Sequence, residues 1–484
     1  MPVGNRVLFM VEPGCEGITW PELHCFDADT GTLVWKTPVD PLAAFPELTD
    51  AKRQEVSAAV ESLYEQGRTT YRICRPLMAV GGAKADHPAV LQANKELAEH
   101  GMTIGSYTPG YGLLRKLRMT DDRRKKWASL YNPYGIKPEC TWQGFGANRV
   151  GLAFSTPVTD GKSVWVMTYH GTLASFDVAT GKQRWSIASG YKGHHGLLAS
   201  PRLWNGMVIA AWFDTSAFDP IVLACDQATG QKRWETRTPT VKVGRERIGR
   251  PGGSPVILDL KGTPVILCSP GRVIRAADGF VYETEIGPTS INTWGMDDKT
   301  DTIFFQTGGD NIPGQRVALE LSLDGDSLAV KERWGHKGWN EFASSVFASG
   351  RLFTSRVQLD PATGFLLGNP TADTDRRKVS QNSPLSKHLL LVANGHVYGF
   401  REEKTKATKD KPEEIRGICE VYTLDGKKVS ANTLAAAKRE GPQLDRFRMQ
   451  GWPDSSFSAC CAMNIGDDRL YLVSDDYLYC IGEK

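Results

Sequence analysis

The chain has 484 residues, of which 40% are hydrophobic and 23% are charged, and its formal net charge is +3 at pH 7. This is the composition of an ordinary globular protein, long enough to bury an ample core. The small net charge gives no reason to expect a nucleic acid as partner, and no apolar run approaches the length of a transmembrane segment.

A short motif recurs along the chain and organises it. The stretch Ser175–Trp185 reads Ser-Phe-Asp-Val-Ala-Thr-Gly-Lys-Gln-Arg-Trp, and the stretches Cys25–Trp35 and Ala224–Trp234 repeat its pattern. In each copy a small residue stands two positions before an aspartate, Thr-Gly follows, and a tryptophan stands eight positions after the aspartate. The aspartate can bond the backbone ahead of it and the glycine can adopt the left-handed conformation. The motif therefore predicts a strand, a tight turn and a second strand.

Weaker copies continue the series with the turn but without the full motif. They centre on Asp278, Asp324, Asp360 and Asp425. Asp226 stands 49 residues after Asp177, Asp278 stands 52 after Asp226, and Asp324 stands 46 after Asp278. A period of about 50 residues made of short strands is typical of a β-propeller with one four-stranded blade per repeat.

The motif resembles the tryptophan-docking motif of the PQQ-repeat, or quinoprotein alcohol dehydrogenase-like, β-propellers. The resemblance covers residues 1–39 and 147–484. It implies an all-β propeller in which the tryptophan of one blade packs against the small residue of a neighbouring blade. It says little about function, because the family contains dehydrogenases that bind the quinone and scaffolds that do not.

In chain order, the strands of this propeller fall into eight groups. We predict eight four-stranded blades, or seven if the short group at 344–359 is not a blade. In the strong copies the outer strand is predicted to end at the tryptophan, and the polar run 402–414 is predicted to be a solvated loop. The last group ends without a fourth strand. We expect the closing strand to be lost upstream of Met1 or its place to be left open.

Residues 40–146 interrupt the repeat and are predicted to be a mainly helical insertion between the first two blades, covering one face of the ring. A helix at 51–66 follows a Thr-Asp cap. The next, at 87–100, has proline in its first turn and glycine just past its end. A third, at 120–130, opens with two aspartates and then turns basic.

Candidate site residues gather in the links that enter each blade and in those that join its second and third strands. These links share one rim over the central channel, where propeller pockets usually lie. The catalytic candidates are His170, His194 and His195, assisted by Tyr169 or Glu341, as metal ligands or as general acid and base. The identity of any metal is left open. Tryptophans could stack on a sugar and arginines could hold an acidic group. The ligand-binding candidates are Trp142, Arg149, Arg247, Arg250, Trp294, His336, Trp339, Asn340, Arg401 and Trp452.

The alternative for the histidines is structural, since loop histidines commonly cap strands and bond carbonyls. No spacing such as His-Glu-x-x-His or Gly-x-Ser-x-Gly decides between the two. Scattered cysteines such as Cys25, Cys225 and Cys480 lie in strand patterns and are predicted to be buried small hydrophobic residues.

Cys460 and Cys461 are adjacent, and the quinone-dependent alcohol dehydrogenases of the family that this chain resembles carry a vicinal disulfide against the quinone ring. The resemblance implies that this pair would contact PQQ, with calcium, if PQQ were bound. The pair also fits the first strand of the last blade, where two small buried residues are ordinary. The calcium ligands and catalytic aspartate of those enzymes have no matching motif here, so no cofactor is assigned.

Three functions follow. The preferred one is a propeller that binds a small ligand, a saccharide or a protein partner over its channel without PQQ, as the family's outer-membrane-assembly lipoprotein binds outside the cytoplasm. The second is a carbohydrate-active lyase or hydrolase that uses the rim histidines. The third is a PQQ-dependent dehydrogenase. A periplasmic or secreted location is expected, although this chain begins without a signal peptide.

Overall fold

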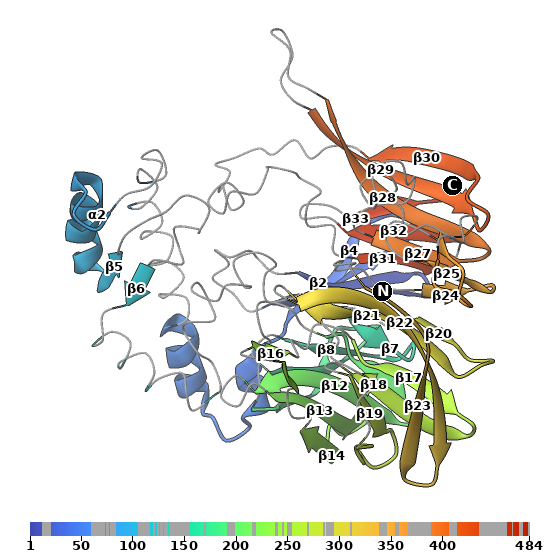
Figure 1. Ribbon diagram of the computed structural model, residues 1–484. Helices are drawn as coiled ribbons and strands as arrows, with labels where there is room; N and C mark the ends of the chain where they lie inside the picture. Colours follow the sequence, from blue (N-terminus) through green and yellow to red (C-terminus); the bar gives the residue numbers. More distant parts are fainter. Residues whose placement is uncertain are drawn as a thin grey trace. The chain divides into compact units, whose positions relative to one another are not determined.

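The described part of the chain is built mainly from short antiparallel sheets in the computed structural model of Figure 1. It forms two units, the first of Met1–Arg6, Leu198–Lys438 and Ser455–Lys484 and the second of Val7–Leu197 and Arg439–Asp454. The residues that the structure describes are 1–11, 21–59, 73, 77, 84–104, 117–119, 122, 125, 129, 134, 155–168, 171–190, 199–214, 219–237, 241–243, 246–248, 254–268, 271–283, 286, 295–309, 312–337, 346–353, 358–365, 367, 389–405, 414–434, 462–466, 468–473 and 478–482.

Eight sheets of three or four strands follow one another along the described residues, and each is made of strands that are consecutive in the chain. Small antiparallel sheets repeated in this way are the construction of a β-propeller. The predicted all-β class with eight blades is confirmed. The alternative of seven blades is wrong, because the short group at 344–359 forms a sheet of its own.

The first two sheets carry the first two strong copies of the motif. The first consists of β1 (Pro2–Val3), β2 (Arg6–Val11), β3 (Glu22–Asp27) and β4 (Leu33–Pro38), and the second of β7 (Val158–Thr159), β8 (Ser163–Met167), β9 (Thr172–Asp177) and β10 (Gln183–Ala188).

The third to eighth sheets follow in the first unit. The third is β11 (Arg202–Trp204), β12 (Met207–Asp214), β13 (Asp219–Asp226) and β14 (Lys232–Arg237); the fourth is β17 (Val256–Leu260), β18 (Thr263–Cys268) and β19 (Arg272–Arg275); the fifth is β20 (Gly295–Asp297), β21 (Thr302–Gly309), β22 (Ile312–Asp324) and β23 (Ser327–Lys337). The sixth is β24 (Val346–Ala348), β25 (Arg351–Phe353) and β26 (Gln358–Leu359); the seventh is β27 (Leu389–Ala393), β28 (His396–Thr405), β29 (Glu414–Thr423) and β30 (Lys428–Leu434); the eighth is β31 (Ala462–Gly466), β32 (Arg469–Val473) and β33 (Leu478–Ile481). A separate hairpin pairs β15 (Val241–Val243) with β16 (Glu246–Ile248).

Two of the three predicted helices of the segment 40–146 begin within one residue of the predicted start, and the third, at 120–130, lies mostly outside the described residues. A short 3-10 helix, η1 (Pro41–Ala44), lies against β10, and residues 50–59 are helical. Thr49 caps this helix, because its Oγ1 accepts from the N–H of Lys52 at 3.3 Å and its carbonyl accepts from the N–H of Arg53 at 2.9 Å. That the segment covers one face of a ring stays a prediction.

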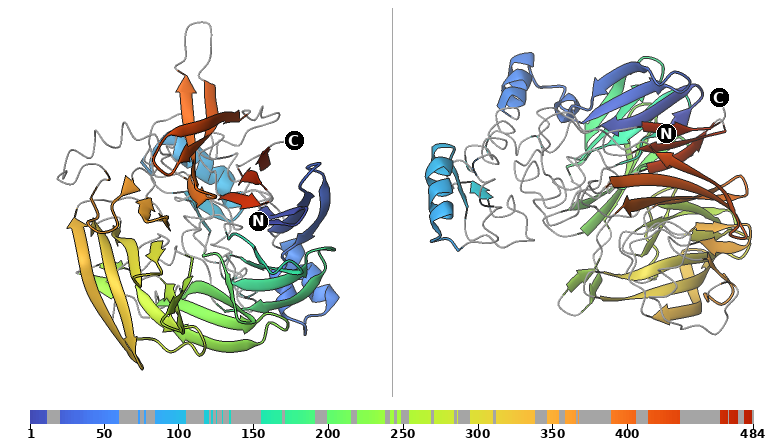
Figure 2. Two further views of the ribbon diagram at one scale, coloured as in Figure 1. Left: turned by 90° about the vertical axis from the view of Figure 1, so that its right-hand side faces the viewer. Right: turned by 90° about the horizontal axis from the view of Figure 1, so that it is seen from above.

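The second helix, α2 (Pro88–Glu99), is followed by a small hairpin that the sequence did not predict. β5 (Met102–Ile104) pairs with β6 (Leu117–Met119), and the hairpin lies beside α2 (Figures 1 and 2). Asn94 fixes it, donating to the carbonyl of Ile104 at 2.9 Å and accepting from its N–H at 2.8 Å. Strands of three residues are too short to show a period of two in the sequence.

The three strong motif copies form the same turn. Oδ1 of each aspartate accepts from the N–H groups two and three residues later and from the threonine hydroxyl, all at 2.9–3.1 Å. The turn glycines Gly31, Gly181 and Gly230 have φ of 68°, 70° and 72°, where a side chain would be strained. The turn chemistry predicted from the motif is therefore the chemistry observed.

The outer strand does not end at the tryptophan, so that prediction is wrong. β4, β10 and β14 each continue for three residues past it. They continue because the tryptophan sits inside the ladder. The small residue two before the aspartate is its cross-strand partner within the same sheet. The pairs are Cys25 with Trp35, Ser175 with Trp185 and Ala224 with Trp234.

Three tryptophans reach from their own sheet to the turn of the next one. In each case the indole Nε1 donates to a carbonyl of that turn, and the ring lies against the turn glycine (Gly181, Gly279 or Gly364). The residue two after the tryptophan adds a second hydrogen bond to the same turn. The indole pairs are Trp35 with Val178 (3.1 Å), Trp234 with Ala276 (3.2 Å) and Trp334 with Pro361 (2.8 Å); the second pairs are Thr37 with Gly181 (2.9 Å), Thr236 with Gly279 (2.6 Å) and His336 with Thr363 (2.7 Å).

The fourth copy of the turn is displaced from the predicted position. Arg275, not Asp278, takes the place of the aspartate, because its N–H donates to the carbonyl of Phe280 at 2.8 Å and its carbonyl accepts from the N–H of Gly279 at 3.0 Å. Arg275 stands 49 residues after Asp226, so the repeat is regular here.

The fifth copy is displaced as well. Trp334 pairs with Ala318, which puts Glu320 at the aspartate position. The ladder does not turn there but runs on to the pair of Asp324 and Ser327.

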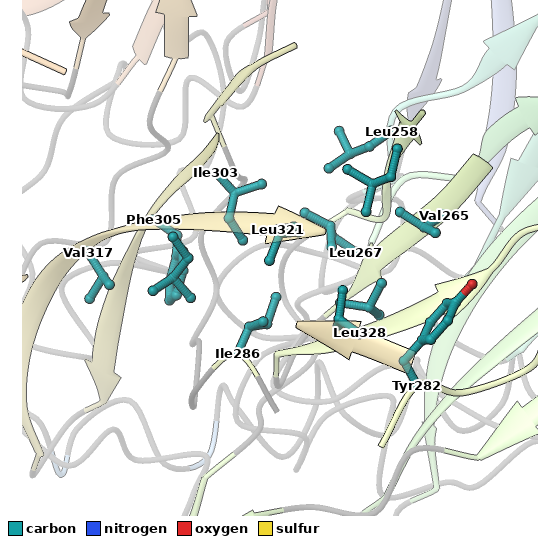
Figure 3. Close-up of a cluster of buried hydrophobic side chains, with 13 residues drawn as sticks. Leu258, Val265, Leu267, Tyr282, Ile286, Ile303, Phe305, Val317, Leu321 and Leu328 are labelled. Atoms are coloured by element: carbon teal, nitrogen blue, oxygen red, sulfur yellow. The ribbon is translucent and has the colours of Figure 1, made fainter. Parts of the chain in front are cut away.

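The long hairpin that results covers the fourth sheet. Leu321 of β22 and Leu328 of β23 lie in one buried cluster with Leu258 and Tyr282 of the preceding repeat (Figure 3). Arg275 adds a charged contact, since its Nη1 lies 2.6 Å from Oδ1 of Asp326 at the hairpin tip. The fourth sheet has three strands among the described residues, and the hairpin supplies part of the apolar cover that it needs.

The polar run 402–414 is strand at both of its ends. β28 extends to Thr405, β29 begins at Glu414, and these two residues pair with each other. The charged sequence has no apolar alternation to indicate a strand, yet the backbone ladder includes residues 402–405 and 414 of the run.

Candidate functional site

Most of the predicted site residues lie outside the described residues, so their roles stay predictions. The structure places Arg247 and Arg401 by backbone alone. Arg247 pairs with Lys242 in the β15–β16 hairpin, and Arg401 pairs with Ile418 inside β28. The residues outside the described part are Tyr169, His170, His194, His195, Glu341, Trp142, Arg149, Arg250, Trp294, Trp339, Asn340, Trp452, Cys460 and Cys461.

His336 is the one candidate whose side chain is described, and it lies between two sheets. Its ring stacks on the ring of Trp334 and contacts that of Phe365, with distances between ring centroids of 5.4 Å and 4.5 Å. Its Nε2 lies 2.7 Å from the carbonyl oxygen of Thr363. Thr37 and Thr236 occupy the same position after their own tryptophans and make the same kind of bond. These contacts hold the fifth sheet to the sixth, and a role in ligand binding stays a prediction.

The described residues include possible metal ligands and several cysteines. No group of three His, Cys, Asp or Glu side chains among the described residues could hold a metal ion. Burial raises the pKa of Cys225 and of Cys268 to about 12, which leaves both thiols protonated and unreactive. Cys25 and Cys225 are buried as predicted, but Cys480 is exposed, so the prediction for that residue is wrong.

One position on the outer strand differs between sheets and defines a surface feature. Each motif ladder has a register shift just before the tryptophan, and the residue left unpaired there is a β-bulge residue. In three sheets it is an arginine that pairs with the acidic residue at the aspartate position of the motif. The distances are 2.6 Å for Arg184 and Asp177, 2.6 Å for Arg233 and Asp226, and 3.6 Å for Arg333 and Glu320.

The bulge arginine acts on the turn as well as on the strand edge. The guanidinium of Arg233 and the turn hydrogen bonds lower the pKa of Asp226 to about 2, so this carboxylate is ionised throughout the physiological range. A charge on an outer strand also opposes unwanted pairing with other chains. The arginine is therefore both a brace for the turn and a protection of the edge.

The first sheet departs from this rule. Its bulge residue is Val34, which is 39% exposed, and the preceding Leu33 is 47% exposed. The seventh sheet has Val429 at the same position, 55% exposed. Together these are three of the five large hydrophobic residues that are exposed in the described part of the chain. We call Leu33 and Val34 the apolar corner of the first sheet.

The sequence itself carries this difference between the copies of the motif. The residue before the tryptophan is Arg in two strong copies and Val in the third. Lys36, the single charged residue of β4, follows two positions after Val34, and its Nζ lies 3.4 Å from Oε1 of Glu22. The corner thus joins two exposed apolar side chains to one half-exposed cation.

The comparison with protein-family models identifies the repeat. Residues 141–339 match the model described as outer membrane protein assembly factor BamB. These are PQQ-like repeats. The match covers the second to fifth sheets, where the PQQ-like repeats carry two strong copies of the motif and the displaced copies at Arg275 and Glu320.

Solved structures match this chain at low sequence identity. BamB from Moraxella catarrhalis is 14% identical, with 67% of this chain and 70% of that one covered and a TM-score of 0.33. The computationally designed Ika8 protein is 11% identical, with coverage of 68% and 95% and a TM-score of 0.34. The quinohemoprotein alcohol dehydrogenase of Comamonas testosteroni is 10% identical, with coverage of 88% and 59% and a TM-score of 0.31. The search of curated proteins gave no match. None of the described helices has the length and apolar character needed to cross a membrane.

Proposed function

We propose that this chain is a protein-binding scaffold of PQQ-like repeats that works outside the cytoplasm and without PQQ, and that it holds its partner at the apolar corner of the first sheet. The observation that carries the proposal is the exposure of Leu33 and Val34 at a place where three other sheets have a braced arginine. The name of the matched family model, an outer membrane protein assembly factor, supports a protein partner and an extracytoplasmic location.

Burial of the apolar corner by a partner would contribute to the free energy of binding. Full burial of a leucine or valine side chain is worth ~1.5–3 kcal/mol, so covering two side chains that are 47% and 39% exposed contributes about 1 kcal/mol each. Such values suit one anchor of a larger interface rather than an interface by itself.

The mode of contact follows from the bulge. Addition of a strand from the partner is disfavoured, because the bulge at Val34 interrupts the edge that the new strand would follow. The partner is instead a protein that covers Leu33 and Val34 with apolar side chains. An acidic residue of that protein would meet Lys36, whose side chain is 53% exposed.

The test restores the arginine of the other sheets. Val34→Arg places a charge in the corner beside Asp27, the same combination that is stable at Arg184 and Asp177, so the variant should fold. A photoreactive residue at position 33 is used in living cells, and adducts are identified by mass spectrometry, with the same residue at the exposed position 182 as control. We expect a defined heterologous partner at position 33 that Val34→Arg abolishes. An adduct that persists in Val34→Arg, an adduct only with a second copy of this chain, or no excess over position 182 would overturn the proposal.

Two further parts of the proposal have their own measurements. Absorbance spectra of the purified protein, with and without added PQQ and calcium, should show no quinone band after desalting. A retained band would make the chain a dehydrogenase and would place Cys460 and Cys461 at the quinone.

Cell fractionation should find the protein outside the cytoplasm, and recovery in the cytoplasmic fraction would contradict the location. The lyase or hydrolase hypothesis rests on His170, His194 and His195, which lie outside the described residues.

A further inference from the structure

Arg202 breaks the pattern of the first strands. The cross-strand registers give the equivalent position on the first strand of five other sheets. In each of these five sheets the residue is apolar or glycine, and none is charged. This edge of the blade is the one that faces the central channel in a propeller. The equivalent residues are Val158, Val256, Gly295, Val346 and Leu391.

Among the described residues, the guanidinium of Arg202 bonds only neutral groups. Its Nε donates to the carbonyl of Pro255 at 3.1 Å and its Nη1 donates to the carbonyl of Pro201 at 3.3 Å. No carboxylate lies within ion-pair distance of it in the described residues. Arg184, Arg233 and Arg275, by contrast, each have an acidic partner at 2.6–2.7 Å.

The environment makes this arrangement costly without a counter-ion. The side chain is half-buried, and burial lowers the pKa of the guanidinium. A cation removed from water and compensated only by carbonyl dipoles loses more hydration energy than it regains. A valine at this position, as in three other sheets, would avoid that loss, so the strand itself does not require the charge.

The remaining donors suit an anion. A guanidinium has five N–H groups, and the two bonds to carbonyls leave one on Nη1 and two on Nη2 that can donate to the oxygens of a carboxylate or phosphate. Ser254 directly precedes Pro255, whose carbonyl accepts from Nε of Arg202; its Oγ accepts from the N–H of Ser200 at 2.9 Å, and its own hydroxyl proton can still be donated. We propose that Arg202, supported by Ser254, binds an oxyanion group, a carboxylate or a phosphate, of a small ligand at the first-strand edge of the third sheet. This site is separate from the apolar corner and does not depend on the protein-binding function.

The experiment measures anion-dependent thermal stability. Inorganic phosphate and D-galacturonate are titrated separately at constant ionic strength, balanced with sodium chloride, because a ligand that binds only the folded state raises the Tm. The variant Arg202→Val installs the residue found in three other sheets, and Arg184→Val is the matched control, since it removes one exposed arginine and the same charge. We expect at least one anion to raise the Tm of the wild-type protein and of Arg184→Val, with binding weakened 10-fold or more in Arg202→Val. Arg202→Lys keeps the positive charge but loses the planar array of guanidinium N–H donors, and it should weaken binding less than Arg202→Val does.

The two probes identify the source of the oxyanion, and a measurement on the wild-type protein guards against a misfolded variant. A response to phosphate alone indicates a phosphorylated ligand, and a response to galacturonate alone indicates a carboxylate. Modification of Arg202 by phenylglyoxal, followed by mass spectrometry with Arg184 as internal reference, should be slowed by the binding anion. Equal Tm responses of wild type and Arg202→Val to both anions, or no protection of Arg202 by either, would overturn the proposal.

Discussion

The indole Nε1 of Trp35 donates a hydrogen bond of 3.1 Å to the carbonyl oxygen of Val178, which lies 143 positions further along the chain. Thr37 reinforces the contact by donating to the carbonyl of Gly181 at 2.9 Å. These two hydrogen bonds join the first sheet to the turn of the second, although the segment 40–146 separates them in sequence. Because closing so long a loop costs conformational entropy, the interaction energy of these contacts must exceed that cost if they are to stabilise the fold.

We predict that Gly181→Ala destabilises the protein more than Gly31→Ala does. Both glycines have nearly the same left-handed φ, 70° and 68°, so each alanine carries the same strain of about 1 kcal/mol. A Cβ at Gly181 would lie 2.6 Å from Cε3 of Trp35, whereas a Cβ at Gly31 meets nothing within 4 Å. The clash should add ~1–3 kcal/mol to the loss at Gly181. Urea unfolding of both variants gives the two free energies. Equal losses in the free energy of unfolding would show that the indole ring of Trp35 can move away from the new Cβ at little cost.

The hydroxyl of Thr236 provides a second prediction for the same kind of contact. It is 8% exposed and donates to the carbonyl of Gly279 at 2.6 Å. Thr236→Val keeps the shape but leaves that carbonyl without its donor, which should lower the free energy of unfolding by ~1–2 kcal/mol. Thr236→Ser retains the hydroxyl and serves as the control. A loss in Thr236→Ser as large as that in Thr236→Val would assign the effect to the methyl group.

The sequence predicted the blades where turn chemistry was intact and misplaced the turns where it was exchanged. Asp, Thr and Gly at fixed spacing define a hydrogen-bonded turn, and those three copies folded as expected. In the fourth copy Arg275 and Asp278 take the places of the aspartate and the threonine, and their side chains bond each other at 2.7–3.1 Å. The pair Asp278-Gly279 therefore marks the threonine position of the turn and not its start at Arg275.

The candidate site was harder to predict for a physical reason. Rim residues were chosen because polar and aromatic side chains in links between strands suit a pocket, but the same side chains suit contacts between sheets. His336 is an example, since its ring and Nε2 are engaged by the Thr363–Phe365 turn. Arg202 begins a strand, and only the cross-strand register shows that its equivalents in five other sheets are uncharged.

Tyr282 gives a prediction about the core of the fourth and fifth sheets. The side chain is fully buried in the cluster of Figure 3, and its hydroxyl has no hydrogen-bond partner among the described residues. Tyr282→Phe removes a buried polar group that is not satisfied, so the free energy of unfolding should stay the same or rise by about 1 kcal/mol. Tyr422→Phe is the control, because that hydroxyl donates to Oε2 of Glu420 at 2.8 Å and its loss should destabilise. Thermal unfolding of both variants decides, and a clear loss in Tyr282→Phe would reveal a partner for the hydroxyl.

The last prediction concerns the pH dependence of the bulge brace. The guanidinium of Arg233 and the turn N–H groups lower the pKa of Asp226 to about 2, below the value of about 3.9 in the unfolded chain. A carboxyl whose pKa is lowered by folding stabilises the protein above its unfolded pKa, and this contribution is lost as the pH falls from about 4 towards 2. Asp226→Asn keeps an oxygen to accept from Ala228 and Thr229 but removes the charge. It should therefore be less stable than the wild type at pH 7, with a difference that shrinks over that range.

Urea unfolding at intervals from pH 7 to about pH 2.5 measures this difference, and Arg233→Gln supplies the matched background. In Arg233→Gln the effect of Asp226→Asn should be smaller at pH 7 and should depend less on pH, because the hydrogen bond from the Arg233 guanidinium, which lowers the pKa most, has been removed. A difference between wild type and Asp226→Asn that is constant over the whole range would mean that the turn, and not the ion pair with Arg233, is what the aspartate serves.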